Sequence, residues 1–391
     1  MSPPLPSPVS SAYSNCSGDV GPLILLCAGG TGGHAFPARA LAEKLISMGL
    51  RVAIATDQRA MKYFDDLQDA QKFMIKSGGY LSGLAAKIKA ARDLVIGLRQ
   101  SYVLLKKLKP AVVIGFGGYP TVPPVLMAQI LGVPTILHEQ NAILGLANKI
   151  LAPRARKIAL SVAATQGIAQ KWIGKTLWTG NPVRGAIIDV AQKPYLLPDF
   201  SSGEKFQIMV VAGSQGARIF SDLVPRALVA LPLELRTRVK ILQQARLQDC
   251  DHVREIYRDG EMEVIIAPFF DNMAECLTNT HLFVARSGAS TTAELTCTGR
   301  PAIYIPFPWH KDQQQLRNAE QIALAGGAVV AEERSLTPEL LTREIEQLLT
   351  HPQRLSDMAK SAKSLGMIDA VDRLADMVLP LLSPAPIQPT P

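Results

Sequence analysis

The chain of 391 residues is poor in cysteine and aromatic residues and has no long uninterrupted apolar run. Its cysteines, at positions 16, 27, 250, 276 and 297, show no metal-ligand spacing, so we expect unbridged thiols in a reducing compartment. Residues 1–20 have no basic start and no apolar stretch, which favours a flexible leader over a secretory signal. Residues 122–137, the most apolar stretch, contain three prolines and predict a short helix and a strand rather than a membrane span.

Charge is distributed unevenly along the chain. With 48% hydrophobic and 19% charged residues, the composition is typical of a packed α/β enzyme. Residues 1–184 carry 21 Lys/Arg and 8 Asp/Glu, whereas residues 185–391 carry 20 and 25. A basic first half indicates an anionic substrate, an anionic membrane surface or nucleic acid. Nucleic acid is the least favoured of these partners, because the cationic segment lacks interleaved aromatic residues.

Short apolar runs alternate with helical patterns, which predicts parallel sheets with crossover helices. The pattern runs once through the first half and starts again near residue 207, so we expect two Rossmann-like halves joined through the Pro-containing stretch 180–203. A helix is expected from Pro37 to Met48 and another from Ile219 to Leu231. The predicted strands are 23–27, 52–56, 111–115, 135–138, 157–160, 207–211, 239–243, 264–268, 282–285, 302–305 and 328–331.

A glycine-rich segment, Gly29 to His34, directly follows the first predicted strand and opens a helix. Glycines there allow a ligand to approach the backbone, and a helix N-terminus attracts anions. The same segment fits a loose dinucleotide fingerprint, with Asp57 at the end of the second strand as the ribose-binding acid. An NAD-dependent enzyme and a tight turn without a ligand therefore remain alternatives.

Two further segments in the second half repeat this arrangement. Gly213 to Arg218 forms a second glycine turn between a strand and a helix, which a dehydrogenase would not need. Arg286 to Glu294 places small hydroxyl residues at a helix start, where they can bind phosphate, and Glu294 one turn later, where it can accept hydrogen bonds from ribose. An ordinary Ser/Thr helix cap is the alternative interpretation of this last segment.

Polar side chains also gather at other expected strand ends. The amides of Gln313 to Gln315 can bind sugar hydroxyls, although a solvated loop would look similar. His138 to Asn141 end a strand beside the expected cleft. Arg184, at the junction of the halves, can reach a phosphate. Both of these groups can also be purely structural.

Seven segments together resemble one family. In chain order GGTGGH, GFGGYP, HEQN, GNPVR, GSQGAR, RSGASTTAE and HKDQQQ are similar to the MurG family of bacterial N-acetylglucosaminyltransferases, from about Leu23 to the final helix. The resemblance implies a GT-B fold: a leader (1–20), an N-terminal acceptor and membrane-side domain (21–184), a UDP-sugar domain (185–366), a helix (367–383) that returns to the first domain, and a tail (384–391). It implies UDP-sugar contacts from Thr31, Gly32, Gly33, Asn141, Arg184, Ser214, Phe270, Ala289, Ser290, Thr291, Thr292, Ala293, Glu294, Gln314 and Gln315.

The resemblance also implies a reaction and its partners. N-acetylglucosamine would move from UDP-N-acetylglucosamine to an undecaprenyl-linked muramoyl-pentapeptide, with inversion, at the cytoplasmic face of the plasma (inner) membrane, without a metal or other cofactor. His34 is the candidate general base, because an imidazole works near neutral pH, and Glu139 is the alternative base or a residue that orients the acceptor. Another UDP-sugar enzyme of the same fold, a glycolipid transferase or an epimerase, and a nucleotide-binding module without catalysis are the remaining alternatives.

The most basic segment of the first half has its own prediction. Between residues 76 and 109, eight Lys/Arg residues and one acid alternate with apolar residues. Cations and apolar residues on one helix suit an anionic membrane surface. An amphipathic core helix with a solvated basic face is the alternative.

Overall fold

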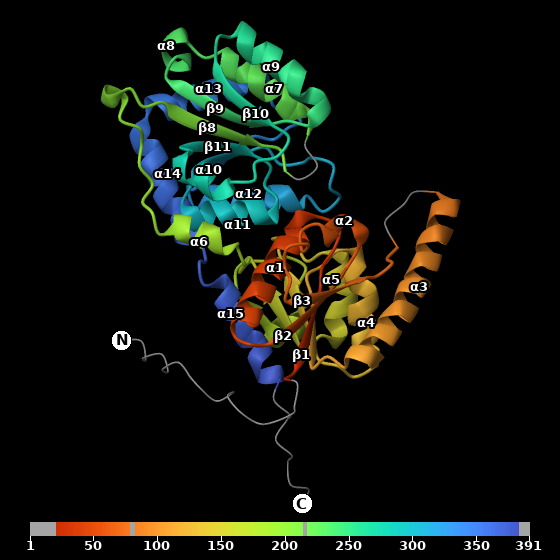
Figure 1. Ribbon diagram of the computed structural model, residues 1–391. Helices are drawn as coiled ribbons and strands as arrows, with labels where there is room; N and C mark the ends of the chain where they lie inside the picture. Colours follow the sequence, from red (N-terminus) through yellow and green to blue (C-terminus); the bar gives the residue numbers. More distant parts are fainter. Residues whose placement is uncertain (1–20, 79–82, 214–216, 383–391) are drawn as a thin grey trace, which may run out of the picture.

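The computed structural model describes residues 21–78, 83–213 and 217–382, which form two parallel sheets with helices on both faces (Figure 1). The first sheet has seven strands in the order β3-β2-β1-β4-β5-β6-β7. All its neighbouring strands pair in parallel. Its strands are β1 (Leu23–Cys27), β2 (Arg51–Thr56), β3 (Ala70–Met74), β4 (Val112–Gly115), β5 (Thr135–Glu139), β6 (Lys157–Leu160) and β7 (Thr176–Trp178).

The second sheet repeats this topology with six parallel strands in the order β10-β9-β8-β11-β12-β13. In each sheet the fourth strand pairs with the first, so the order reverses beside β1 and again beside β8. Ligands of open α/β sheets bind at the carboxyl ends of the strands at this reversal. The strands are β8 (Phe206–Val211), β9 (Val239–Gln244), β10 (Glu263–Ala267), β11 (Leu282–Ala285), β12 (Ala302–Tyr304) and β13 (Ala328–Val330).

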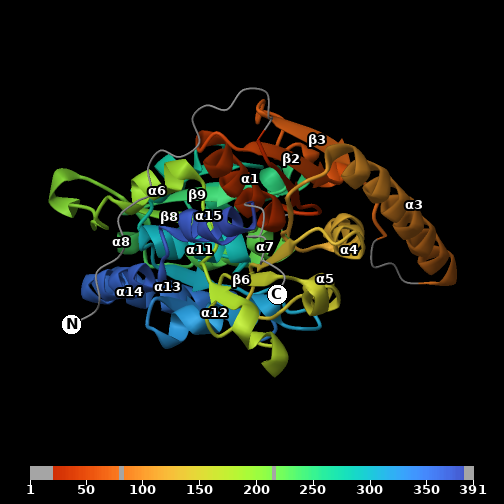
Figure 2. The ribbon, with the colours of Figure 1, turned by 90° about the horizontal axis from the view of Figure 1, so that it is seen from below.

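Helices cover both faces of each sheet (Figure 2). In the first half they are α1 (Gly32–Ser47), α2 (Gln58–Met61), α3 (Leu84–Leu108), α4 (Val122–Ile130) and α5 (Leu146–Leu151). The second half and the C-terminal part contribute α6 (Gly185–Ala191), α7 (Arg218–Val229), α8 (Leu233–Arg236), α9 (Cys250–Asp259), α10 (Met273–Asn279), α11 (Ala289–Thr298), α12 (Gln314–Leu324), α13 (Pro338–Thr350), α14 (Pro352–Leu365) and α15 (Ala370–Val378).

The last helix returns to the first sheet. Alternate residues of β1 pack into different cores, because successive side chains of a strand point to opposite faces. Leu374 and Val378 of α15 join the core between this sheet and α1. Lys44 of α1 forms an ion pair with Asp372 at 2.5 Å. The chain therefore passes from the first half to the second and back again.

The predicted fold class, two Rossmann-like parallel sheets, is confirmed. The expected strands agree with the structure to within about one residue, but β3 and β7 were not predicted. Helix α1 begins at Gly32, five residues before the predicted start, so the glycine-rich segment forms its first turn. The final helix is shorter than 367–383, since α15 ends at Val378 and a 3-10 turn, Leu379–Leu381, follows. Within the described residues no helix is long and apolar enough to span a membrane.

Candidate active site

A cleft of about 570 Å³ lies between the halves and is lined by both of them. The first half contributes the start of α1 and the segment after β5, and the second half contributes the loops after β8, β11 and β12. Sequence-predicted residues that line it are Thr31, Gly32, Gly33, His34, Asn141, Ala289, Ser290, Thr291, Gln314 and Gln315. Ser214 lies outside the described residues.

The turn before α1 leaves the first residues of this helix accessible to the cleft. Gly30 has a φ of +87°, a conformation that favours glycine, and its backbone N–H donates to Asp57 Oδ1 at 2.9 Å. Thr31 precedes the helix without a side-chain cap, so the first-turn amides remain available to a ligand. Asp57 also accepts from the backbone N–H of Ala60 and pairs with Arg59 at 2.8 Å. Both oxygens of Asp57 therefore have protein partners in the ligand-free structure, one of them the largely exposed Arg59.

His34 lines the cleft and rests against the loop after β4. Gly117 and Gly118 have positive φ, and a Cβ added at either would lie 3.3 Å from the His34 ring. Glycine at these two positions therefore leaves room for the imidazole. The Nδ1 atom is buried without a hydrogen-bond partner. Burial lowers the pKa of His34 below its usual value, against smaller opposing effects of Gly29 and Asp57. Because Nδ1 is enclosed by protein, a proton from a ligand in the cleft would have to be accepted at Nε2, and the lowered pKa favours the neutral imidazole that this role needs.

Glu139 is placed differently from His34. Its side chain is buried, and Oε1 accepts from the backbone N–H of Asn141 at 3.1 Å and from its amide at 3.2 Å. Oε2 accepts from Gly145 N and Asn148 Nδ2, both at 2.8 Å. Burial raises the pKa of Glu139, and these hydrogen bonds oppose that rise. Its oxygens are engaged by the protein, so the geometry opposes Glu139 as a general base and supports a role in positioning Asn141.

The start of α11 combines a free helix end with a buried cation. Ser290 Oγ is buried without a partner, and Gly288 provides no side-chain cap. Arg286, which directly follows β11, is 6% exposed and donates to Ile305 O at 2.8 Å. It pairs with Glu333 at 2.5 Å. Its guanidinium carbon lies 5.0 and 5.5 Å from the ring centres of Phe220 and Phe307. Arg286 was missed as a site residue from sequence.

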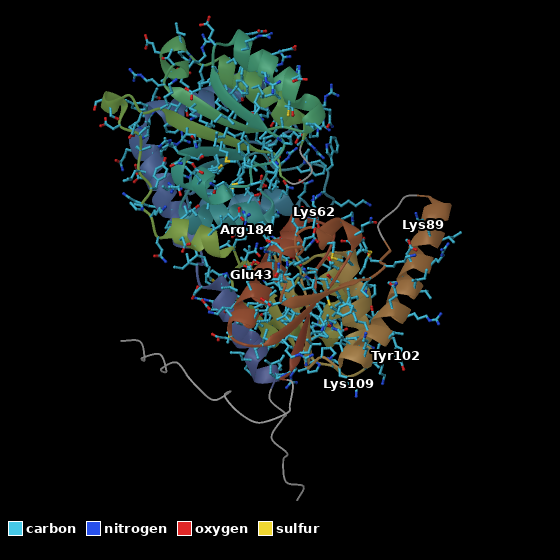
Figure 3. All side chains as sticks on the ribbon, in the orientation of Figure 1. Glu43, Lys62, Lys89, Tyr102, Lys109 and Arg184 are labelled. Atoms are coloured by element: carbon cyan, nitrogen blue, oxygen red, sulfur yellow. The ribbon has the colours of Figure 1, made fainter. Side chains whose placement is uncertain are left out.

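Arg184 and Glu294 bind each other rather than line the cleft. The Arg184 Nη2 to Glu294 Oε1 distance is 3.0 Å, and the guanidinium lies 4.9 Å from the ring centre of Phe36. Figure 3 shows Arg184 at the junction of the two halves. Burial raises the pKa of Glu294, and Arg184 opposes this rise. The UDP-sugar contacts expected of Arg184 and Glu294 stay predictions, and without a ligand the two side chains pair with each other.

Three other predicted contacts also lie away from the cleft. Thr292 and Ala293 line a second, separate pocket, because they follow the first turn of α11 and face another side of the helix. Phe270 packs against the core of the second half.

The side-chain amides at the start of α12 hold one wall of the cleft in place. Gln314 Nε2 bonds His310 Nδ1 at 2.8 Å, and Gln315 Oε1 accepts a hydrogen bond from Phe307 N at 3.0 Å.

Asn318, which sequence reasoning missed, joins the two halves. It is buried on α12 and donates to Asn141 Oδ1 and to Ser287 O, both at 3.1 Å. Its own oxygen accepts from Ala142 N at 2.8 Å. Because these partners belong to both sides of the cleft, Asn318 fixes their spacing. Its position one turn after Gln314 was the available sequence signal.

One Asp-x-Asp triplet occurs, at residues 249–251. Such triplets can bridge a metal to a diphosphate, but these carboxylates lie outside the cleft. Asp249 bonds Arg246 at 2.7 Å and Ser221 at 3.0 Å. Among residues 21–78, 83–213 and 217–382, no group of three or more His, Cys, Asp or Glu side chains is arranged to hold a metal ion.

Two facing Rossmann-like halves with a cleft built from both define the GT-B class of nucleotide-sugar enzymes. Residues 24–160 match the N-terminal domain of glycosyltransferase family 28, and residues 207–374 match its C-terminal domain. The chain belongs to this family and is a glycosyltransferase.

Relatives with known names cover nearly the whole chain. Proteins of Rhodospirillum centenum and Rhizobium etli are 43% and 44% identical over 91% of this chain and over 93% and 94% of their own lengths. Both are named UDP-N-acetylglucosamine–N-acetylmuramyl-(pentapeptide) pyrophosphoryl-undecaprenol N-acetylglucosamine transferase. The crystal structure of Acinetobacter baumannii MurG is similar with a TM-score of 0.73 and 26% identity, covering 92% of this chain and all of that one.

Proposed function

We propose that this glycosyltransferase moves N-acetylglucosamine from UDP-N-acetylglucosamine to an undecaprenyl-linked muramoyl-pentapeptide at the cytoplasmic face of a membrane. The observation that carries the proposal is the cleft itself, which is lined by His34 of α1 and by the uncapped start of α11 with the unpartnered Ser290 Oγ. The near-complete coverage of relatives that carry this activity in their names supports the choice of donor and acceptor.

The donor diphosphate is assigned to the start of α11. The free backbone amides there, the unpartnered Ser290 Oγ and the nearby Arg286 guanidinium all favour an anion. On donor binding, Glu294 exchanges Arg184 for the ribose hydroxyls, which releases Arg184 toward the diphosphate. Backbone contact of Phe270 with uracil, and contacts of Ser214, belong to the same proposal.

The reaction is a single displacement. His34 accepts the proton of the acceptor hydroxyl as its oxygen bonds to the anomeric carbon. The bond between that carbon and the diphosphate oxygen breaks, and the electron pair leaves with UDP, so the configuration inverts. The positive ends of α1 and α11 and Arg286 stabilise the charge that develops on UDP.

Helix α3 is the proposed membrane-binding element. Its exposed residues recur at alternating intervals of four and three and therefore share one face, with apolar and basic residues in turn: Ile88, Arg92, Val95, Arg99, Tyr102 and Lys106. In Figure 3, Lys89 is labelled near the start of this helix and Tyr102 near its end. Such a face suits an anionic lipid surface.

Vesicle sedimentation tests this element. We expect binding to anionic but not to neutral vesicles, and loss of that binding in the double variant R92E/R99E. The matched control R254E/R258E reverses two exposed arginines on α9 of the second half and is expected to bind normally. Equal binding of both variants would reject α3 as the membrane element.

A donor panel tests the transferase itself. UDP-N-acetylglucosamine, UDP-glucose, UDP-N-acetylgalactosamine and NAD are compared by thermal shift and then by turnover with a lipid-diphosphate acceptor. We expect stabilisation by the uridine nucleotides, none by NAD, and turnover with UDP-N-acetylglucosamine only. Release of free N-acetylmannosamine without an acceptor would indicate an epimerase instead.

A further inference from the structure

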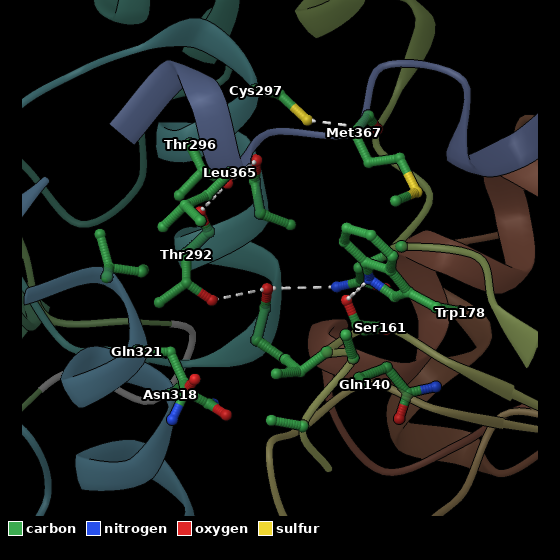
Figure 4. Close-up of a pocket in the computed structure, with 18 residues that line it drawn as sticks. Gln140, Ser161, Trp178, Thr292, Thr296, Cys297, Asn318, Gln321, Leu365 and Met367 are labelled. Carbon is green, nitrogen blue, oxygen red and sulfur yellow. Dashed lines mark hydrogen bonds between the residues drawn. The ribbon is translucent and has the colours of Figure 1, made fainter. Parts of the chain in front are cut away.

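A second cavity, here called the back pocket, lies between the halves beside α11 (Figure 4). Its volume is about 180 Å³. The first half contributes Gln140, residues 161–164, Trp178, Gly180 and Asn181. The second half contributes one side of α11 and of α12, and Leu365 and Met367 line it where the chain returns. Ala289 at the start of α11 and Gln140 after β5 line both this pocket and the catalytic cleft, so the two cavities adjoin each other.

No charged side chain lines the back pocket. None of its lining residues is Asp, Glu, Lys, Arg or His, whereas Arg218, Arg286 and Glu333 line the cleft. A charged group placed there would lose water without gaining an ionic partner, which is costly. The pocket therefore excludes phosphates and favours a neutral molecule.

Two acceptors of residues that line the back pocket are buried without a partner, Asn181 Oδ1 and Gln140 Oε1, and Gln140 also lines the cleft. Several lining donors already bond backbone carbonyls: Thr292 Oγ1, Thr296 Oγ1, Cys297 Sγ and Trp178 Nε1. Asn181 is 6% exposed, and its Nδ2 donates to Ala289 O at 3.1 Å. Its Oδ1 is buried and accepts no hydrogen bond. A buried acceptor without a donor is costly, so a ligand N–H or O–H there would be stabilised.

We propose that the back pocket binds a neutral, ring-sized molecule that donates one hydrogen bond to Asn181 Oδ1. A cavity near 150 Å³ is known to hold benzene, so this volume suits a substituted six-membered ring. The exposed residues Ala163 and Ala164 and the 47% exposed Trp178 form the entrance, and the indole offers a flat surface for the ring. This pocket adjoins the catalytic cleft through Gln140 and Ala289, but the proposal does not rest on the transferase reaction and its test needs no substrate.

Three monosubstituted benzenes test the chemistry on the full chain. Benzamide is neutral with a donor, toluene is neutral without one, and benzoate is charged. Saturation-transfer NMR is expected to show benzamide bound at least fivefold more tightly than toluene and tenfold more tightly than benzoate. UDP, which binds in the cleft, should leave benzamide bound.

Matched variants locate the binding. Ala164→Phe fills the entrance and is expected to weaken benzamide at least tenfold, while Ala325→Phe, an exposed alanine after α12 that does not line the pocket, is expected to have no effect. Ala163→Phe replaces Ala164→Phe if thermal melting shows that the latter is unfolded. Equal affinity for the three probes, no detectable benzamide binding, displacement by UDP, or unchanged binding in the folded entrance variant would overturn the proposal.

Discussion

Helices α1 and α11 contact each other across the junction and begin in the same way, yet their first turns carry different chemistry. Neither has a side-chain cap, so each presents free amides and a partial positive charge. The first turn of α1 carries His34, whose pKa is lowered by burial, whereas the first turn of α11 carries Ser290 with an unpartnered hydroxyl and is preceded by the buried Arg286. The same backbone end thus serves proton transfer on one side and anion binding on the other.

Removing the imidazole should have the largest effect. We expect His34→Ala to lower kcat by about 10²–10⁴-fold, the usual contribution of general base catalysis, with UDP affinity changed less than about twofold. Steady-state kinetics and calorimetry with UDP measure the two quantities. Equal losses in kcat and in UDP affinity would reject the assignment of His34 to proton transfer.

Removing the charge of the buried Arg286 should weaken anion binding at the start of α11. Arg286→Met keeps an apolar stem between Phe220 and Phe307 but loses the charge, so UDP should bind about 10–100-fold more weakly. Arg246→Met removes an arginine that pairs with Asp249 outside the cleft and is the control. If both variants bind UDP like the unmodified protein, α11 does not hold the diphosphate.

The pH dependence separates the two helix starts without mutation. The base works when it is deprotonated, and burial lowers the pKa of His34, so kcat/KM should stay constant as pH falls to 6.5. Below the shifted pKa it should fall about tenfold per pH unit. The affinity for UDP should not fall together with kcat/KM over this pH range. An acid limb centred above pH 6.5 would contradict the assignment.

The smallest effect is expected from Ser290→Ala. Its Oγ has no protein partner, so the variant should melt like the unmodified protein while UDP affinity falls about 5–10-fold. Ser287→Ala is the matched comparison, because Ser287 Oγ donates to Gln315 O at 2.8 Å and its loss should destabilise the fold by about 1 kcal/mol. A drop in melting temperature for Ser290→Ala alone would reverse this comparison.

The central strands were predictable because a strand buried on both faces needs a continuous apolar run. Strands β3 and β7 lie at the two edges of the first sheet and have exposed positions, so neither forms a continuous apolar run. Strand β3 contains Gln71 and Lys72, and β7 has only three residues. The predicted start of α1 was five residues too late because glycine has a low helix propensity and a glycine-rich segment predicts a loop. In the structure, packing within the fold overrides this propensity, and Gly32 and Gly33 are helical.

The candidate site was predictable where residues follow strand ends, as with His34, Asn141 and Ser290. Arg286 was missed because arginine is rarely buried unless it is paired, and its partner Glu333 lies 47 residues further along the chain. The pairing of Arg184 with Glu294 could not be anticipated for the same reason, since their contact depends on how the halves meet.

The two passages of the backbone between the halves touch each other. A Cβ at Gly180 would lie 2.6 Å from Met367 Sδ, and Cys297 Sγ donates to Met367 O. Two halves connected at adjoining points can rotate about these points but cannot move apart. Two adjoining connections of this kind keep the effective concentration of one wall of the cleft near the other high.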